Sequence, residues 1–292
     1  MRKTSHLGAG LPEVCRLGLA TRGNTHLTAS DVEHAIERGL NYLNWCGKPD
    51  GMSEVIARLG ARRKNVVIAV QFQARTAEKS KREFARLLKE LRTDYLDIAT
   101  LYYVESEDEW REIISEGGAR DALAREKEAG TLRMIGLTSH QRELAAGWAE
   151  QPIAGQSGSI IMPQAGSSQT QRYLDMLMIR YNAAHRSAER DVFPVAQRLR
   201  TPVVTFTGLR WRALLQSTPD DPPGFSPPSA ADCYRFCLSN PAVSVALTAP
   251  DNRADLEANL ALLTDWRPLD AASRDAIRDH GDRVRQHAGK FW

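Results

Sequence analysis

The chain has 292 residues, of which 42% are hydrophobic and 26% are charged, and its formal net charge is +3. This length is enough for one large domain with a sizeable core, and we expect residues 1–292 to form a single domain. Acidic and basic residues are interspersed, which argues against nucleic acid as a partner. We find no signal peptide at the start, no apolar run near the ~20 residues of a membrane span, and too few cysteines for a disulfide framework. These features favour a cytoplasmic protein.

Short β-branched runs alternate with longer helical stretches along the chain. The predicted strands are residues 16–20, 40–45, 65–70, 95–101, 133–137, 176–181, 202–206 and 243–247. Predicted helices include residues 29–39, 53–59, 77–91 and 119–129. A strand followed by a helix, repeated about eight times, favours an α/β fold of the closed (β/α)8 TIM-barrel type. An open doubly wound sheet is the competing fold, but the turn after the first strand lacks the glycine pattern that such a sheet requires.

Two segments interrupt this alternation. Residues 155–170 are rich in Ser, Gly and Gln, a composition typical of a loop. Residues 218–229 are dense in proline and cannot hold a helix or an inner strand. Because the second segment follows the seventh predicted strand, it lies at the barrel face where active sites are built. It is either a lid over the site or a solvated linker.

A series of short motifs accompanies the predicted strands. They are GLNYLNW at 39–45 with GMSE at 51–54, VVIAVQ at 66–71, DYLDI at 94–98, EAGTLRMIGLTS at 128–139, YN at 181–182 and DLEANL at 255–260. Each motif is weak alone, but their order and spacing resemble those of the aldo-keto reductase superfamily over residues 15–265. The resemblance implies a (β/α)8 barrel, a nicotinamide cofactor and a small carbonyl compound as substrate.

The positions that carry the chemistry in this family hold unexpected residues. The resemblance aligns the family's catalytic Asp, Tyr, Lys and His with Asn44, Pro49, Gln71 and Tyr102. In the family the Tyr protonates the carbonyl oxygen during hydride transfer, and the Lys–Asp pair lowers the pKa of that Tyr. Here Asn44 and Gln71 replace both members of the buried ion pair, so neither position keeps an unpaired charge. Asn44, Gln71 and Tyr102 remain the candidate catalytic residues, with Tyr102 either a replacement proton donor or a space-filling partner of the two amides.

Candidate substrate contacts are aromatic or cationic. Trp45 and Tyr103 are predicted to line an apolar substrate pocket, together with the terminal Phe291 and Trp292. Arg180 shares one strand face with Met178 and would need an anionic partner if that face points into the barrel. That partner is either a substrate carboxylate or phosphate, or a structural carboxylate.

The resemblance also implies a set of cofactor contacts. They are Thr138, Ser139, Phe206, Thr207, Leu209, Arg253 and Asn259. Phe206 matches the aromatic residue that stacks on nicotinamide, and Thr138 with Ser139 matches the pair that holds its carboxamide. Arg253 is the cation nearest to Asn259 in the sequence, and it stands between Asp251 and Asp255. Because carboxylates suit a ribose hydroxyl better than a phosphate, both NADP(H) and NAD(H) stay open.

Other reactive side chains give weaker signals. His140 and His185 follow strands on the functional face and could do acid–base work, while Cys233 and Cys237 lack the second pair of ligands that a metal site needs. The leading hypothesis is a divergent aldo-keto reductase-like oxidoreductase with a non-canonical proton donor acting on a small molecule. The alternatives are a lyase or isomerase on the same barrel, or a catalytically inactive ligand-binding protein.

Overall fold

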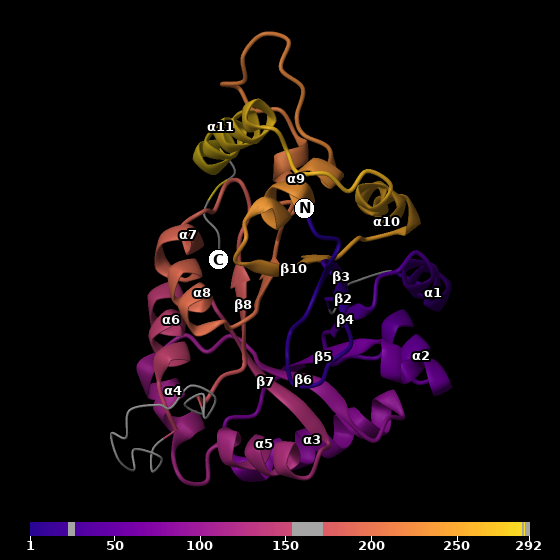
Figure 1. The fold of residues 1–292 in the computed structure, drawn as a ribbon, viewed down its shortest axis with the longest axis vertical. Helices are drawn as coiled ribbons and strands as arrows, with labels where there is room; N and C mark the ends of the chain where they lie inside the picture. The colour runs from indigo at the N-terminus through magenta and orange to yellow at the C-terminus, as the bar shows by residue number, and fades with distance from the viewer. Residues whose placement is uncertain (23–26, 154–171, 288, 290–292) are drawn as a thin grey trace, which may run out of the picture.

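The computed structural model describes residues 1–22, 27–153, 172–287 and 289. The predicted loop at 155–170 and the terminal Phe291 and Trp292 lie outside these ranges. Eight parallel strands close into a barrel in the order β10-β3-β4-β5-β6-β7-β8-β9, and helices surround it on the outside (Figure 1). The predicted α/β (β/α)8 TIM barrel is therefore confirmed.

All eight strands predicted from the sequence are present, with ends that move by no more than two residues. They are β3 (Leu17–Ala20), β4 (Tyr42–Trp45), β5 (Val67–Phe72), β6 (Leu96–Leu101), β7 (Leu132–Ser139), β8 (Met176–Arg180), β9 (Val203–Phe206) and β10 (Val243–Thr248). Two shorter strands, β1 (Thr4–Ser5) and β2 (Val14–Cys15), form an antiparallel pair before the barrel. Leu7, Leu11 and Val14 of this hairpin belong to the same buried cluster as the inner barrel residues. The hairpin thus covers the amino-terminal end of the barrel, opposite the functional face.

The helices follow the strands in chain order. They are α1 (Ala29–Glu37), α2 (Gly51–Ile56), α3 (Ala77–Leu91), α4 (Glu107–Ile114), α5 (Ala119–Glu128), α6 (Arg142–Glu150), α7 (Ala188–Asp191), α8 (Phe193–Leu199), α9 (Ala230–Ser239), α10 (Arg253–Leu260) and α11 (Ala271–His287), with 3-10 turns η1 (Gly60–Asn65), η2 (Ala213–Leu215) and η3 (Ala261–Leu263). Helix α3 is typical of the ring: Thr76 caps its first turn, and Phe84, Leu87 and Leu91 bury one stripe of it. Within the described residues, no helix has both the length and the apolarity to cross a membrane.

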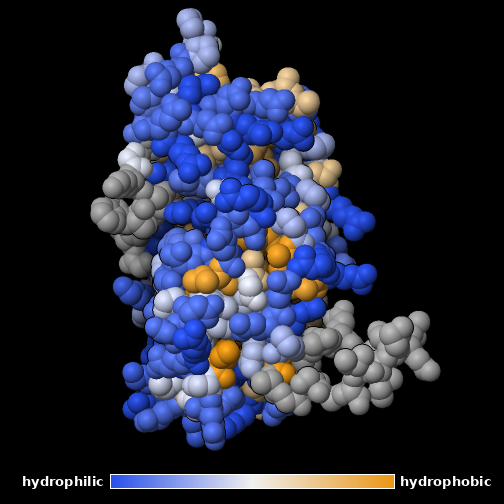
Figure 2. All heavy atoms as spheres, turned by 90° about the vertical axis from the view of Figure 1, so that its left-hand side faces the viewer, coloured by the Kyte–Doolittle hydropathy of each residue, from blue (hydrophilic) through white to orange (hydrophobic). Residues whose placement is uncertain are grey.

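Barrel side chains alternate between two buried clusters, as the period of two of a strand requires. Inner positions such as Ala69, Ile98 and Met134 fill the barrel, while their sequence neighbours pack outward under the helices. The outer face over α4, α6, α7 and α8 is mostly hydrophilic, with small scattered hydrophobic patches (Figure 2). Strand alternation therefore decides which residues reach the site inside the barrel and which support the helices.

The proline-rich segment at 218–229 carries no helix or strand, as predicted. Asp221 in this segment accepts hydrogen bonds from Arg283 Nε at 2.7 Å and from the backbone N–H of Thr218 at 2.6 Å. His280 Nδ1 lies 3.3 Å from Asp221 Oδ1, the oxygen that Arg283 also contacts. The segment is thus held against α11 next to the functional face.

Candidate active site

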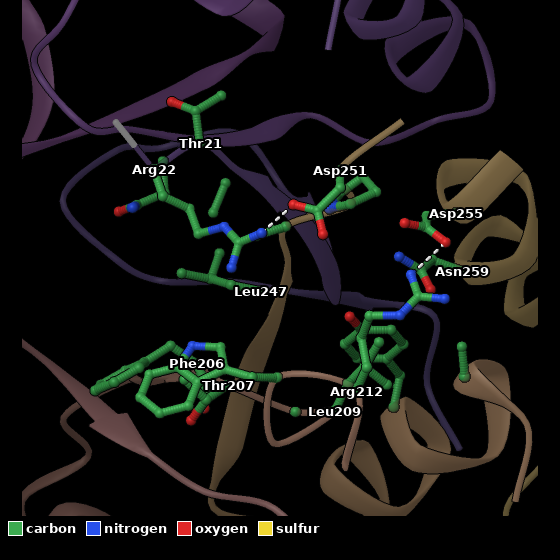
Figure 3. Close-up of a pocket in the computed structure, with 18 of the residues that line it drawn as sticks. Thr21, Arg22, Phe206, Thr207, Leu209, Arg212, Leu247, Asp251, Asp255 and Asn259 are labelled. Carbon is green, nitrogen blue, oxygen red and sulfur yellow. Dashed lines mark hydrogen bonds and ion pairs between the residues drawn. The ribbon is translucent and has the colours of Figure 1, made fainter. Parts of the chain in front are cut away.

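A cavity of about 420 Å³ opens at the carboxyl-terminal ends of the barrel strands. Asn44, Gln71 and Tyr102 line part of it. Another part, which Figure 3 shows, lies between β10, α10 and the segment after β9. Pro228 and Ser229, at the end of the proline-rich segment, also line it. Because barrel enzymes build their active sites at this face, the cavity is the candidate active site.

The three candidate catalytic residues meet in this cavity. Asn44 and Gln71 come from the neighbouring strands β4 and β5, and Tyr102 follows the end of β6. Asn44 is 1% exposed, and its Oδ1 has no hydrogen-bond partner among the described residues. A buried acceptor without a partner is costly, so this amide is poised for a hydrogen bond from a bound molecule. Pro49 is exposed and does not line the cavity.

Tyr102 is not tuned as a strong acid by its surroundings. Burial raises the pKa of its phenol, and hydrogen bonding to Tyr103 raises it further. The charges of Tyr103 and Cys46 raise the pKa of Tyr102 as well. None of the groups that act on this phenol is a cation that would lower its pKa. Its ring lies 4.0 Å from that of Tyr103, which lines the cavity as predicted.

Trp45 is placed differently from the prediction. Its side chain is fully buried in the outer cluster, and its indole Nε1 donates to the carbonyl oxygen of Lys48 at 2.9 Å. Strand alternation explains this placement, because Asn44 points into the barrel and its neighbour must then point outward. The structure therefore does not place Trp45 at the cavity, where the prediction put it.

Arg180 ends β8 on the same strand face as Met178, which lines the cavity, but Arg180 itself does not line it. Burial lowers the pKa of Arg180, as do the charges of Arg142 and Arg210, whereas Tyr103 and Glu105 oppose this shift. Arg180 therefore lies within electrostatic reach of the cavity wall.

The two candidate histidines differ in their surroundings. Burial, followed by the charge of Arg180, lowers the pKa of His185 to about 3, so it is neutral at physiological pH and cannot serve as an acid there. His140 instead packs beside Tyr103, with ring centroids 4.5 Å apart. Its Nδ1 lies 3.1 Å from Glu105 Oε1, and its backbone N–H donates to the same oxygen at 3.0 Å.

Four of the predicted cofactor contacts line the cavity: Phe206, Thr207, Leu209 and Asn259. Asn259 is fixed by a 2.7 Å hydrogen bond from its Nδ2 to Thr248 Oγ1. The wall between them needs Gly208, because a Cβ at this position would lie 2.9 Å from the ring of Tyr234. A flat aromatic ring, a fixed amide and a close backbone approach suit a nucleotide with a planar head group.

Thr138 and Ser139 are fully buried and do not line the cavity. Thr138 is paired in register with Met178, which does, and its Oγ1 has no hydrogen-bond partner in the described part of the chain. Ser139 Oγ accepts a hydrogen bond from the backbone N–H of Gln141 at 2.9 Å. The orphaned hydroxyl of Thr138 is compatible with a carboxamide group bound above it, whereas the hydroxyl of Ser139 is already used.

We call the part of the cavity between β10 and α10 the cofactor end. The cations there differ from the one predicted. Arg253 does not line the cavity; its guanidinium bonds Asp31 at 3.2 Å and Glu257 at 2.9 Å, between α1 and α10. The structure therefore does not place Arg253 at the cavity, where the prediction put it. Two arginines that sequence analysis missed line the cavity instead. Arg22 pairs with Asp251, and Arg212 pairs with Asp255 at 2.6 Å (Figure 3).

Comparisons with known proteins agree with this architecture. The model of the aldo/keto reductase family matches residues 16–226. The holo form of aldo-keto reductase AKR11C1 from Bacillus halodurans has a similar fold, with a TM-score of 0.72, 17% identity and 96% of each chain covered. Glycerol dehydrogenase AKR11B4 from Gluconobacter oxydans gives a TM-score of 0.69 at 15% identity, covering 97% of this chain and 96% of that one. A comparison with curated proteins gives no significant match. Since the family model spans well over half of the sequence, the chain belongs to the aldo/keto reductase family.

Proposed function

We propose that the protein is a nicotinamide-dependent oxidoreductase that reduces a small carbonyl compound without the catalytic residues usual for its family. The observation that carries this proposal is the shared cavity. Phe206 and Asn259 border the same space as Asn44, Gln71 and Tyr102, so a cofactor held by the first two would face the side chains of the other three. All four cysteines are free thiols, which supports the cytoplasm as its location.

The chain's own residues would bind and orient both molecules. When bound, the cofactor supplies the hydride. Phe206, which lines the cavity, offers a face for a planar ring. The amides of Asn44 and Gln71 and the hydroxyl of Tyr102 are neutral hydrogen-bonding groups around the place left for a carbonyl oxygen. Fixed donors of this kind stabilise negative charge that develops on an oxyanion in a site with little water.

The ion pairs at the cofactor end favour NAD(H) over NADP(H). A 2′-phosphate is best held by arginine forks, but each arginine here already faces a carboxylate. Arg22 is paired with Asp251, Arg212 with Asp255, and Arg253 lies outside the cavity. Binding a phosphate would bring it close to these carboxylates, whereas a ribose hydroxyl can donate to them. We therefore propose NAD(H) as the cofactor.

One observation favours a second candidate function. The residues aligned with the family's catalytic tetrad retain no charged side chain, and Pro49 lies away from the cavity. A protein that binds a small molecule in this cavity without hydride transfer, either as a non-redox enzyme or as a binding protein, would have the same neutral lining.

Calorimetric titration with NADH and then with NADPH separates these functions. We expect micromolar affinity for NADH and at least about tenfold weaker affinity for NADPH, because a factor of ten corresponds to the ~1.4 kcal/mol of one modest charge interaction. Phe206→Leu should weaken NADH binding by removing the aromatic face. Phe84→Leu is the matched control, since Phe84 is a buried residue of α3 and does not line the cavity. Binding of neither nucleotide would overturn the oxidoreductase proposal and leave the second candidate.

A further inference from the structure

We infer that Tyr103, and not Tyr102, delivers the proton to the carbonyl oxygen. This inference rests on the proposed function and names the catalytic acid within it. Two consecutive tyrosines line the cavity, although the alternation of a strand would turn one of them away. The backbone and the surroundings of Tyr103 explain both how it reaches the cavity and why its phenol suits the role.

The backbone at Tyr103 is left-handed, with φ of +49°. This conformation is unfavourable for an aromatic residue and persists only where surrounding structure imposes it. Here both neighbours are fixed: the N–H of Tyr102 donates to Phe72 O at 2.9 Å, and the N–H of Val104 donates to Thr138 O at 3.0 Å. Arg75 Nη2 also donates to Tyr102 O at 2.6 Å. The fold thus holds a strained turn that directs Tyr103 into the cavity.

The ring of Tyr103 lies between those of Tyr102 and His140, at 4.0 and 4.5 Å. Glu105 fixes His140 by accepting from both its ring Nδ1 and its backbone N–H. The ring of Tyr103 is thus held by two neighbouring rings, one of which is itself fixed by a carboxylate.

Arg180 provides a positive charge near Tyr103. Burial lowers the pKa of Arg180 first of all, and the charge of Tyr103 opposes that shift, so the two groups lie close enough to interact. The titratable groups around this phenol are Tyr102, Glu105, His140 and Arg180, with Arg142 acting on Arg180 from α6. Burial and hydrogen bonding instead raise the pKa of Tyr102, with no cation to offset them.

The proposed step balances in atoms and charge. The O–H bond of Tyr103 breaks and an O–H bond forms on the carbonyl oxygen, and a bound reduced nicotinamide would supply the hydride that the carbonyl carbon needs. The carbonyl compound would then become an alcohol at the expense of the reduced nicotinamide, and Tyr103 is left as a phenolate. The phenolate then takes a proton from solvent, because Tyr103 is only partly buried.

The test compares Tyr103→Phe with Tyr102→Phe at saturating NADH. Both changes remove one hydroxyl and keep the ring, and thermal unfolding checks that both variants fold. We expect Tyr103→Phe to lower kcat by about 10²–10⁴-fold, the usual contribution of a general acid, with NADH affinity unchanged. Tyr102→Phe should cost much less.

Retention of kcat by Tyr103→Phe, or a larger loss in Tyr102→Phe, would overturn the assignment. Failure of the wild-type protein to bind NADH would instead be a failure of the proposed function. A second measurement does not follow turnover: calorimetry measures the binding of a small alcohol, the product class, in the presence of NADH. Tyr103→Phe should weaken alcohol binding more than Tyr102→Phe does, and equal affinities in the two variants would contradict the inference.

Discussion

Asn44 and Gln71 show how a barrel can exchange a buried ion pair for two neutral amides. Both side chains border the cavity from the adjacent strands β4 and β5. A single charge at either place would lack a partner of opposite sign in its neighbour, and an unpaired buried charge is strongly unfavourable. The neutral pair therefore leaves no unpaired buried charge in the folded protein. It cannot support the chemistry that depends on the charged pair.

Replacing Asn44 with Asp should destabilise the protein at neutral pH by about 3–5 kcal/mol, the usual cost of an unpaired buried charge. Burial raises the folded-state pKa of such a carboxyl above its unfolded value of about 3.9. The penalty should therefore be absent below that pH, grow through the folded-state pKa and stay constant above it. Adding Gln71→Lys should recover part of the loss. Urea unfolding of the single and double variants measures this coupling, and a coupling near zero would show that the two positions do not act as a pair.

At the scale of elements, the proline-rich segment and α11 form one structural unit. His280 is fully buried in α11; its Nδ1 faces Asp221, and its Nε2 lies 3.1 Å from the carbonyl oxygen of Leu214. The imidazole thus lies between a carboxylate of the proline-rich segment and a backbone oxygen of η2. Phe225 covers the same ring at 5.0 Å. These contacts hold the segment against α11 and thereby place Pro228 and Ser229 at the cavity.

Asp221→Asn should release this segment. Burial alone would raise the pKa of Asp221, but hydrogen bonds from Thr218, Arg283 and His280 lower it well below its usual range. A depressed carboxyl pKa contributes stability above the unfolded value of about 3.9, and this contribution is lost as pH falls through the folded-state pKa. We expect faster amide hydrogen exchange over 218–229 in the variant at neutral pH, and in the wild type only under strongly acidic conditions. Asp220→Asn is the matched control, because Asp220 is largely exposed and pairs with His287. Equal exchange in both variants would show that Asp221 does not hold the segment against α11.

The elements also show what sequence can and cannot predict. The barrel strands were predictable because strands buried on both faces are nearly continuous apolar runs. The β1–β2 hairpin was not, since two-residue strands carry no periodic pattern. Within the site, the order of the motifs predicted the four positions Asn44, Gln71, Tyr102 and Phe206, which line the cavity. Trp45 was predicted there too, because the prediction did not consider that side chains alternate between the two faces of β4. The pairing of Arg22 with Asp251 joins positions 229 residues apart, and no local signal in the sequence connects them.

At the scale of the whole molecule, the barrel separates stability from function. The hairpin and its apolar residues cover the amino-terminal end, so substitutions there should act on folding. The carboxyl-terminal end carries the cavity, the proline-rich segment and the ion pairs of the cofactor end. A ligand that binds only the folded cavity stabilises the entire barrel by linkage. Thermal unfolding can therefore report on cofactor choice without any substrate.

NADH at 100 times its Kd should raise the free energy of unfolding by about 2.7 kcal/mol, which raises Tm by several degrees for a chain of this size. NADPH at the same concentration should give a smaller shift. Asp255→Asn leaves Arg212 without its carboxylate partner, so the freed guanidinium can meet a 2′-phosphate and the NADPH shift should approach that of NADH. Glu257→Gln is the control on the same helix, since Glu257 pairs with Arg253 and Arg38 outside the cavity. If Asp255→Asn leaves the two shifts as different as in the wild type, the ion pair of Arg212 does not set the preference. The preference must then come from the Arg22–Asp251 pair, and Asp251→Asn should change it instead.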